Sequence, residues 1–123
     1  MEVIIMKNLK NLYLKLNDKF VDYIDTIEKR ENYINPDDFG IGYRLKFPNE
    51  YGASIVKFCG SYGYEQDKWE LALLMKCGDT WGLCYTELVC DDVVGFLSDE
   101  EVNIILDRII NGDVNCDFHD IIK

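Results

Sequence analysis

The chain has 123 residues, of which 48% are hydrophobic and 13% aromatic, a composition that excludes a disordered chain. Its 23 acidic and 13 basic residues give a net charge of −10, which disfavours contact with nucleic acid and with anionic membranes. The same charge keeps a surface soluble and attracts basic protein surfaces. At this length we expect one domain, residues 1–123, with a core of its own.

The cysteines predict a reducing compartment. There are five, an odd number, and no C-x-x-C pair occurs. Residues 1–6 lack the basic start and the long apolar run of a secretory signal, and no stretch has the length of a membrane span. We therefore expect a cytoplasmic protein with free thiols. The thiols are those of Cys59, Cys77, Cys84, Cys90 and Cys116.

Residues 8–30 have the pattern of an amphipathic helix. Their apolar side chains recur at spacings of three and four and form one stripe, with acidic side chains mainly on the opposite side. Because that polar face is acidic, packing against a sheet is favoured over binding to a membrane. The stripe consists of Leu9, Leu12, Leu16, Phe20, Tyr23, Ile24 and Ile27.

Four segments have the pattern of strands and predict two successive hairpins. Residues 41–47 alternate apolar and polar side chains, residues 48–50 form a turn, and residues 51–58 return as a second strand. Residues 69–77 and the stretch that begins at Trp81 form the second hairpin. We expect this second hairpin to be the centre of the sheet.

The turn of the second hairpin decides which side chains share a face. A three-residue turn at residues 78–80 places Cys77 opposite Trp81. A two-residue turn instead places Trp81 on the face of Glu70 and Lys76. We favour the three-residue turn, because it keeps the apolar residues of both arms on one face.

Residues 59–67 form the most irregular stretch, with two glycines and two tyrosines. Tyrosines on a glycine-rich loop suit contact with a partner or a flat ligand, because they offer a large area at a low cost in conformational entropy. The alternative is that Tyr62 and Tyr64 fold back on the sheet.

The sequence from Ser98 to Glu101 is a capping box that starts a C-terminal helix. Asp91 and Asp92, before it, are expected to be solvated turn residues. The helix closes at Asn111 and presents one apolar face, formed by Val102, Ile105, Leu106 and Ile109.

These elements predict an α+β fold: an N-terminal helix, a four-stranded antiparallel sheet of two successive hairpins, and a C-terminal helix packed on the sheet. One face of the sheet is buried under the helices. Trp69 and Leu73 are expected to lie under the first helix.

No catalytic or metal-binding motif occurs. The single histidine, His119, forms a C-x-x-H pair with Cys116, but a structural zinc site needs four ligands. No GxGxxG, P-loop or GxSxG sequence is present. We therefore expect no metal, no cofactor and no enzymatic activity.

Several segments resemble a family of small, mostly uncharacterised proteins of bacterial phages and prophages. They are YGASIV at 51–56, SYG at 61–63, WELALL at 69–74 and LCYTELVCDDVVGFLSDEEV at 83–102. The family pattern differs within the last segment, because Thr86 here follows Tyr85 directly and Cys90 precedes the two aspartates. The resemblance spans about residues 42–110 and implies a phage or mobile-element origin, but it transfers no activity.

This resemblance and the charge together predict a small acidic phage protein that inhibits a host defence nuclease by binding to it, without catalysing a reaction. The leading candidate for that nuclease is a CRISPR effector. Its partner would be a host protein with a basic nucleic-acid-binding surface, contacted in the host cytoplasm, and the acidic side chains would imitate a nucleic acid. The oligomeric state stays open. The expected acidic contacts are Asp18, Asp22, Asp25, Glu28, Asp91 and Asp92.

The alternative hypothesis is a binding module for a small ligand or nucleotide signal, with Tyr62, Tyr64 and Trp69 around the ligand. Its weakness is the shortage of arginine and lysine near this loop in the sequence to hold phosphates. The sequence leaves open whether the interface is the acidic face of the predicted first helix or the loop at residues 59–67, which we call the tyrosine loop.

Overall fold

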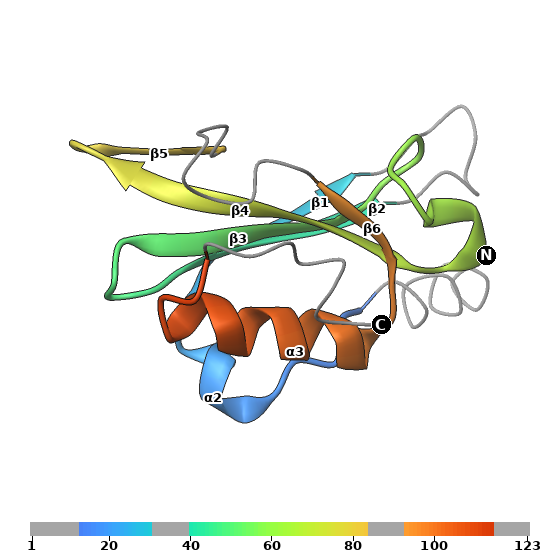
Figure 1. The fold of residues 1–123 in the computed structure, drawn as a ribbon. Helices are drawn as coiled ribbons and strands as arrows, with labels where there is room; N and C mark the ends of the chain where they lie inside the picture. Colours follow the sequence, from blue (N-terminus) through green and yellow to red (C-terminus); the bar gives the residue numbers. More distant parts are fainter. Residues whose placement is uncertain (1–12, 31–39, 84–92, 115–123) are drawn as a thin grey trace.

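A computed structural model describes residues 13–30, 40–83 and 93–114. Nine elements follow one another in these ranges (Figure 1), of which α2 and η1 are single short turns. In chain order they are α2 (Asp18–Val21), β1 (Ile24–Arg30), β2 (Gly40–Lys46), β3 (Tyr51–Lys57), η1 (Tyr64–Gln66), β4 (Trp69–Cys77), β5 (Thr80–Leu83), β6 (Val94–Leu97) and α3 (Asp99–Ile110).

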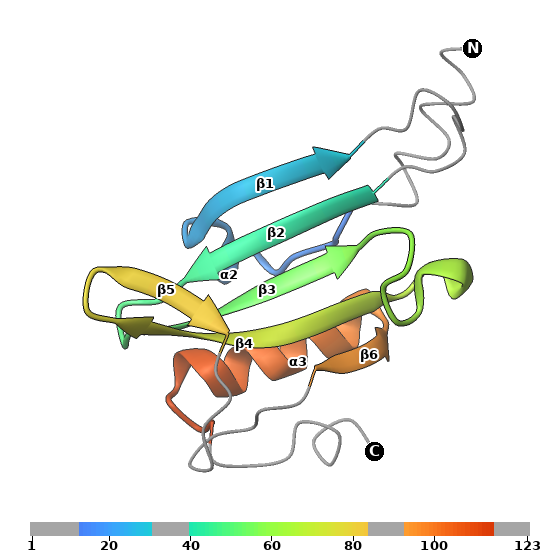
Figure 2. The same cartoon turned by 90° about the horizontal axis from the view of Figure 1, so that it is seen from above.

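The strands form one curled antiparallel sheet in the order β1-β2-β3-β4-β5, with β6 also paired to β4 (Figure 2). One edge of β4 pairs with β3 along most of its length. Its other edge is shared, since β5 pairs with residues 74–77 and β6 with Trp69 and Leu71. Strand β4 thus has three partners and is the centre of the sheet.

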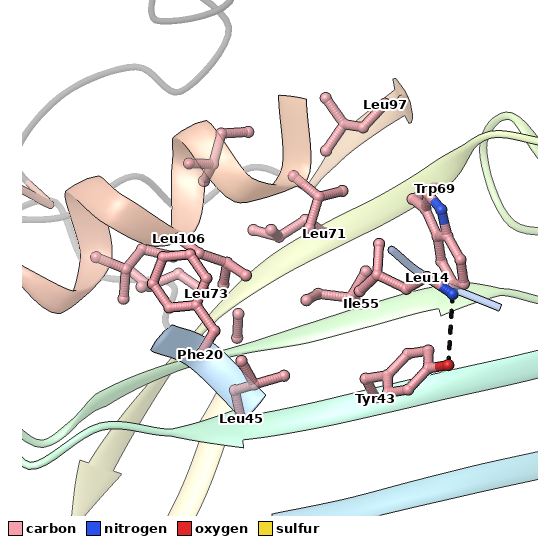
Figure 3. Packing of buried hydrophobic residues seen from close by; sticks show 14 of the residues in the cluster. Leu14, Phe20, Tyr43, Leu45, Ile55, Trp69, Leu71, Leu73, Leu97 and Leu106 are labelled. Carbon is pink, nitrogen blue, oxygen red and sulfur yellow. Dashed lines mark hydrogen bonds between the residues drawn. The ribbon is translucent and has the colours of Figure 1, made fainter. Parts of the chain in front are cut away.

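The core lies between one face of the sheet and α3, which runs along that face (Figure 1). The odd-numbered residues of β2 and β3, and those of β4 as far as Met75, point into it. Leu106 of α3 joins Leu71 and Leu73 of β4 in one cluster (Figure 3). The buried members are Leu14, Phe20, Ile41, Tyr43, Leu45, Phe47, Ala53, Ile55, Trp69, Leu71, Leu73, Val94, Leu97, Val102, Ile105, Leu106, Ile109 and Val114.

The predicted N-terminal helix is wrong over residues 13–30. Only Asp18–Val21 is helical, and Ile24–Arg30 forms β1, paired with β2. Residues 24–30 form a strand instead of a helix because they pair with β2. The edge of β2 offers backbone hydrogen bonds to this segment, which is rich in β-branched residues. Residues 8–12 of the predicted helix lie outside the described residues. Trp69 and Leu73 are buried as expected, but α3, and not a long first helix, lies along their face of the sheet.

The predicted four-stranded sheet is also wrong, because β1 and β6 join it. The turn of the second hairpin has two residues: Cys77 pairs with Thr80, and Trp81 is opposite Lys76. Gly78 takes a φ of +64°, which a tight two-residue turn requires at its first position. Trp81 therefore points away from the core, and its ring lies 5.5 Å from the ammonium of Lys46.

The helix start was predicted correctly. Ser98 Oγ accepts from the amide of Glu101 at 3.2 Å, and Glu101 Oε1 accepts from the amide of Ser98 at 3.0 Å. The other end of α3 is held by the turn between β2 and β3, where Asn49 Nδ2 donates to the carbonyls of Ile109 and Ile110. The capping box satisfies amides at the start of α3, and the Asn49 amide attaches its other end to the sheet.

Candidate ligand-binding pocket

A pocket of about 380 Å³ opens where the start of β4 meets the start of α3. Four parts of the chain line it: the extended segment at residues 13–15, the end of β3, residues 66–69 from the end of η1 to the start of β4, and the N-terminal end of α3. We call it the Lys57 pocket, after the buried lysine that it contains. Its volume is within the range of small-molecule sites in proteins.

Lys57 is a charged residue in a core-facing position. Its side chain is 3% exposed, and its ammonium lies 3.0 Å from Asp67 Oδ1. The same nitrogen lies 4.3 Å from the ring centroid of Trp69. An isolated buried ammonium would be strongly unfavourable, and these two contacts offset that cost. The position of Asp67 depends on its left-handed backbone, with φ +59° and ψ 40°.

Trp69 connects the pocket to α3. Its indole nitrogen donates to Asp99 Oδ1 at 2.8 Å. Its ring packs edge-on against Tyr43, with centroids 5.9 Å apart. Asp99 belongs to the first turn of α3, where a carboxylate is favoured by the helix dipole. This hydrogen bond therefore ties the floor of the pocket to the helix terminus.

The segment that carries Tyr13 and Lys15 is held by two buried polar side chains. Asn103 of α3 accepts from the amide of Asn17 at 2.8 Å and donates to the carbonyl of Lys15 at 3.0 Å. The hydroxyl of Tyr43 accepts from the amide of Leu14 at 3.4 Å (Figure 3). Burial raises the pKa of this hydroxyl above its ordinary value of 10.0, an effect that the hydrogen bond from Leu14 opposes.

The charge of the pocket differs from that of the chain. Three lysines line it, against two carboxylates that are already bonded to Lys57 and Trp69. Within the described part of the chain, no hydrogen bond or ion pair engages the ammonium groups of Lys15 and Lys68. The lining therefore has more cationic than anionic side chains, in a protein whose net charge is −10.

The tyrosine loop is divided between two environments. Tyr64 is partly buried and packs against the core, as the alternative prediction had it, whereas Tyr62 is 63% exposed. Neither tyrosine lines the Lys57 pocket, but Gln66 and Asp67 of the same loop do. The sequence prediction missed Lys57. Its odd residue number could have indicated an inward position, because the other odd-numbered residues of this strand are apolar.

The acidic residues do not form a ladder on one helix. Asp18 lies in α2, Asp22 caps it, and Asp25 and Glu28 lie on β1; all four are exposed. Asp25 pairs with Lys46 at 3.2 Å and Glu28 with Arg30 at 3.0 Å. Two of the four charges are therefore partly neutralised. Two further acidic candidates, residues 91–92, lie outside the described residues.

Comparison of the chain with protein-family models, with curated proteins and with solved structures found no match. Among residues 13–30, 40–83 and 93–114, no group of three or more potential metal ligands occurs. In the same ranges no helix has the length and apolar character of a membrane span. The candidate function is therefore argued from the pocket itself.

Proposed function

We propose that this chain is a non-catalytic binding module that holds a small anionic ligand with a planar ring, of mononucleotide type, in the Lys57 pocket. The observation that carries the proposal is the pair of ammonium groups on Lys15 and Lys68, which have no partner among the described residues. Lys68 directly follows the tyrosine loop in the sequence, whereas Lys15 is brought to the same pocket by the fold. An anion between them would exchange water for two charge-assisted hydrogen bonds.

The remaining lining groups suit the rest of such a ligand. Tyr13 is 43% exposed, and its ring, which has the Lys29 ammonium 5.3 Å from its centroid, would offer a surface for stacking. Gln66 and Ser98 offer side chains that both donate and accept, which is what the edge of a base requires. Asp67 and Asp99 repel an anion less than free carboxylates would, because they already bond Lys57 and the Trp69 indole.

We expect adenosine monophosphate to bind the pocket and adenosine to bind at least about tenfold more weakly, since the phosphate supplies the contacts to both lysines. Lys15→Ala and Lys68→Ala should each weaken adenosine monophosphate about tenfold, measured by isothermal titration calorimetry. The matched control is Lys76→Ala, which removes an exposed lysine of β4 that does not line the pocket. It should leave the affinity unchanged.

Equal binding of adenosine and adenosine monophosphate would contradict the proposed anion site. Equal losses in Lys68→Ala and Lys76→Ala would show that the nucleotide responds only to the general charge of the protein. No binding of either compound would overturn the mononucleotide assignment.

The second candidate is inhibition of a host defence nuclease, such as a CRISPR effector, by an acidic surface that occupies a basic nucleic-acid channel. It is supported by the exposure of Asp18, Asp22, Asp25 and Glu28 on two consecutive elements, α2 and β1, and by the charge of −10. Such a contact would act through long-range attraction and would leave the partner chemically unchanged.

Replacing these four carboxylates by Asn or Gln should slow association with such a nuclease and weaken its inhibition, while the protein stays folded. Surface plasmon resonance at low and at physiological salt should also show a steep loss of affinity as the salt rises. The matched control removes four exposed carboxylates elsewhere and should have a smaller effect. An interaction that is indifferent to both sets and to salt would contradict this candidate. The control carboxylates are Glu50, Asp79, Glu100 and Asp113.

A further inference from the structure

Two residues with exposed aromatic side chains, Tyr62 and Phe96, are joined through their backbone. The amide of Phe96 in β6 donates to the carbonyl of Tyr62 at 3.3 Å. Gly95 lies against Tyr62 so closely that a Cβ on Gly95 would come within 2.4 Å of the Tyr62 Cβ. The tyrosine loop and β6 therefore fit together at this point without room for a side chain between them.

Phe96 occupies a backbone conformation that phenylalanine disfavours. Its φ is +60°, in the left-handed region, where the pairing of β6 with β4 shifts register between Trp69 and Leu71. Glycine is the usual residue at such a position in a bulge. The side chain is 49% exposed, so core packing accounts for little of its presence. A strained residue that presents an aromatic ring to solvent is typical of a binding surface.

Carboxylates accompany the two rings. Glu70 Oε1 accepts from the amide of Tyr62 at 3.0 Å, which places this carboxylate beside the loop. Glu65, three residues after Tyr62 in the chain, is exposed. Aromatic faces combined with carboxylates complement the guanidinium group, which stacks on rings and bonds carboxylates through its fork of donors.

We infer that Tyr62 and Phe96 form a docking surface for arginine side chains of a basic protein partner. Arginine and aromatic residues dominate the energetics of protein interfaces, and burying two exposed rings would provide a central contact. The inference is independent of the ligand proposed above, because neither side chain lines the Lys57 pocket.

Fluorescently labelled nona-arginine and nona-lysine peptides test the inference with the full chain, by fluorescence anisotropy. The two peptides carry the same charge. We expect nona-arginine to bind about fivefold or more tightly, because the planar guanidinium group stacks on a ring and bonds carboxylates through a fork of donors, whereas an ammonium acts on both only as a point charge. Phe96→Gly and Tyr62→Ser should each lower its affinity about fivefold and bring it close to that of nona-lysine. Ile104→Ser, which removes an exposed apolar side chain of α3, should leave the affinity unchanged.

Phe96→Gly is the decisive variant, because glycine adopts the left-handed conformation without strain and the unfolding midpoint should be maintained or raised. A loss of binding at an unchanged unfolding midpoint cannot be attributed to unfolding. Equal affinities for the two peptides, or an unchanged preference for arginine in both variants, would overturn the inference. Such results would show that the peptides respond only to the negative charge of the whole protein.

Discussion

Trp69→Ala should lower the free energy of unfolding by about 3–5 kcal/mol, the range for a buried tryptophan. The side chain is fully buried, packs edge-on against Tyr43 and donates its indole N–H to Asp99. Its loss would leave a large cavity between β4 and α3 and would remove the ring beneath the Lys57 ammonium. Urea denaturation followed by circular dichroism measures the change.

Trp69→Phe distinguishes the contribution of the aromatic ring to stability from that of the indole hydrogen bond. It keeps an aromatic face under Lys57 but leaves Asp99 without its indole donor, and we expect a loss of about 1–3 kcal/mol. A loss below about 1 kcal/mol for Trp69→Ala would contradict the buried position, since such a cost is typical of partly exposed sites.

The strands β2, β3 and β4 and the helix α3 could be predicted because local pattern and tertiary structure agree there. The alternation in residues 41–47 continues through a turn into a second strand, and the pairing of Leu45 with Ala53 has the register of that hairpin. The capping box is a local interaction between Ser98 and Glu101 and needs no distant partner.

The predicted N-terminal helix was wrong because residues 20–27 are compatible with both a helix and a strand. Phe20, Tyr23, Ile24 and Ile27 have helical spacing, yet most of this stretch is β-branched or aromatic and suits a strand as well. The choice is made by pairing with β2, the next strand along the chain, which lies outside the stretch in which the helical spacing occurs. Strand β6 was missed for a similar reason, since four residues carry too little periodicity to be recognised without β4.

The pocket could be predicted only in part. The inward position of Lys57 follows from the parity of β3, but nothing local to it indicates Asp67 or Trp69. Tyr13 and Lys15 reach the pocket through Asn103, which follows them by more than eighty residues. A site built from four separate segments depends on the tertiary fold, and the sequence shows only its individual members.

Phe20→Ala should lower the free energy of unfolding by about 3–5 kcal/mol. Phe20 is fully buried although it belongs to a helix of four residues, and its ring lies 6.1 Å from that of Phe47. The short helix has little stability of its own, so this side chain is what attaches it to the core. Chemical denaturation of the variant and of the unaltered protein measures the difference.

Ile27→Thr is the matched variant that separates the observed fold from a continuous N-terminal helix. In such a helix Phe20 and Ile27 would share the buried stripe, and both substitutions would be strongly destabilising. In the structure Ile27 lies on β1 and is 51% exposed, while threonine keeps the β-branched shape that a strand favours. We therefore expect a loss of less than about 1 kcal/mol for Ile27→Thr. Similar large losses at both positions would contradict the assignment of residues 24–30 to the edge of the sheet, because they would require Ile27 to be as deeply packed as Phe20.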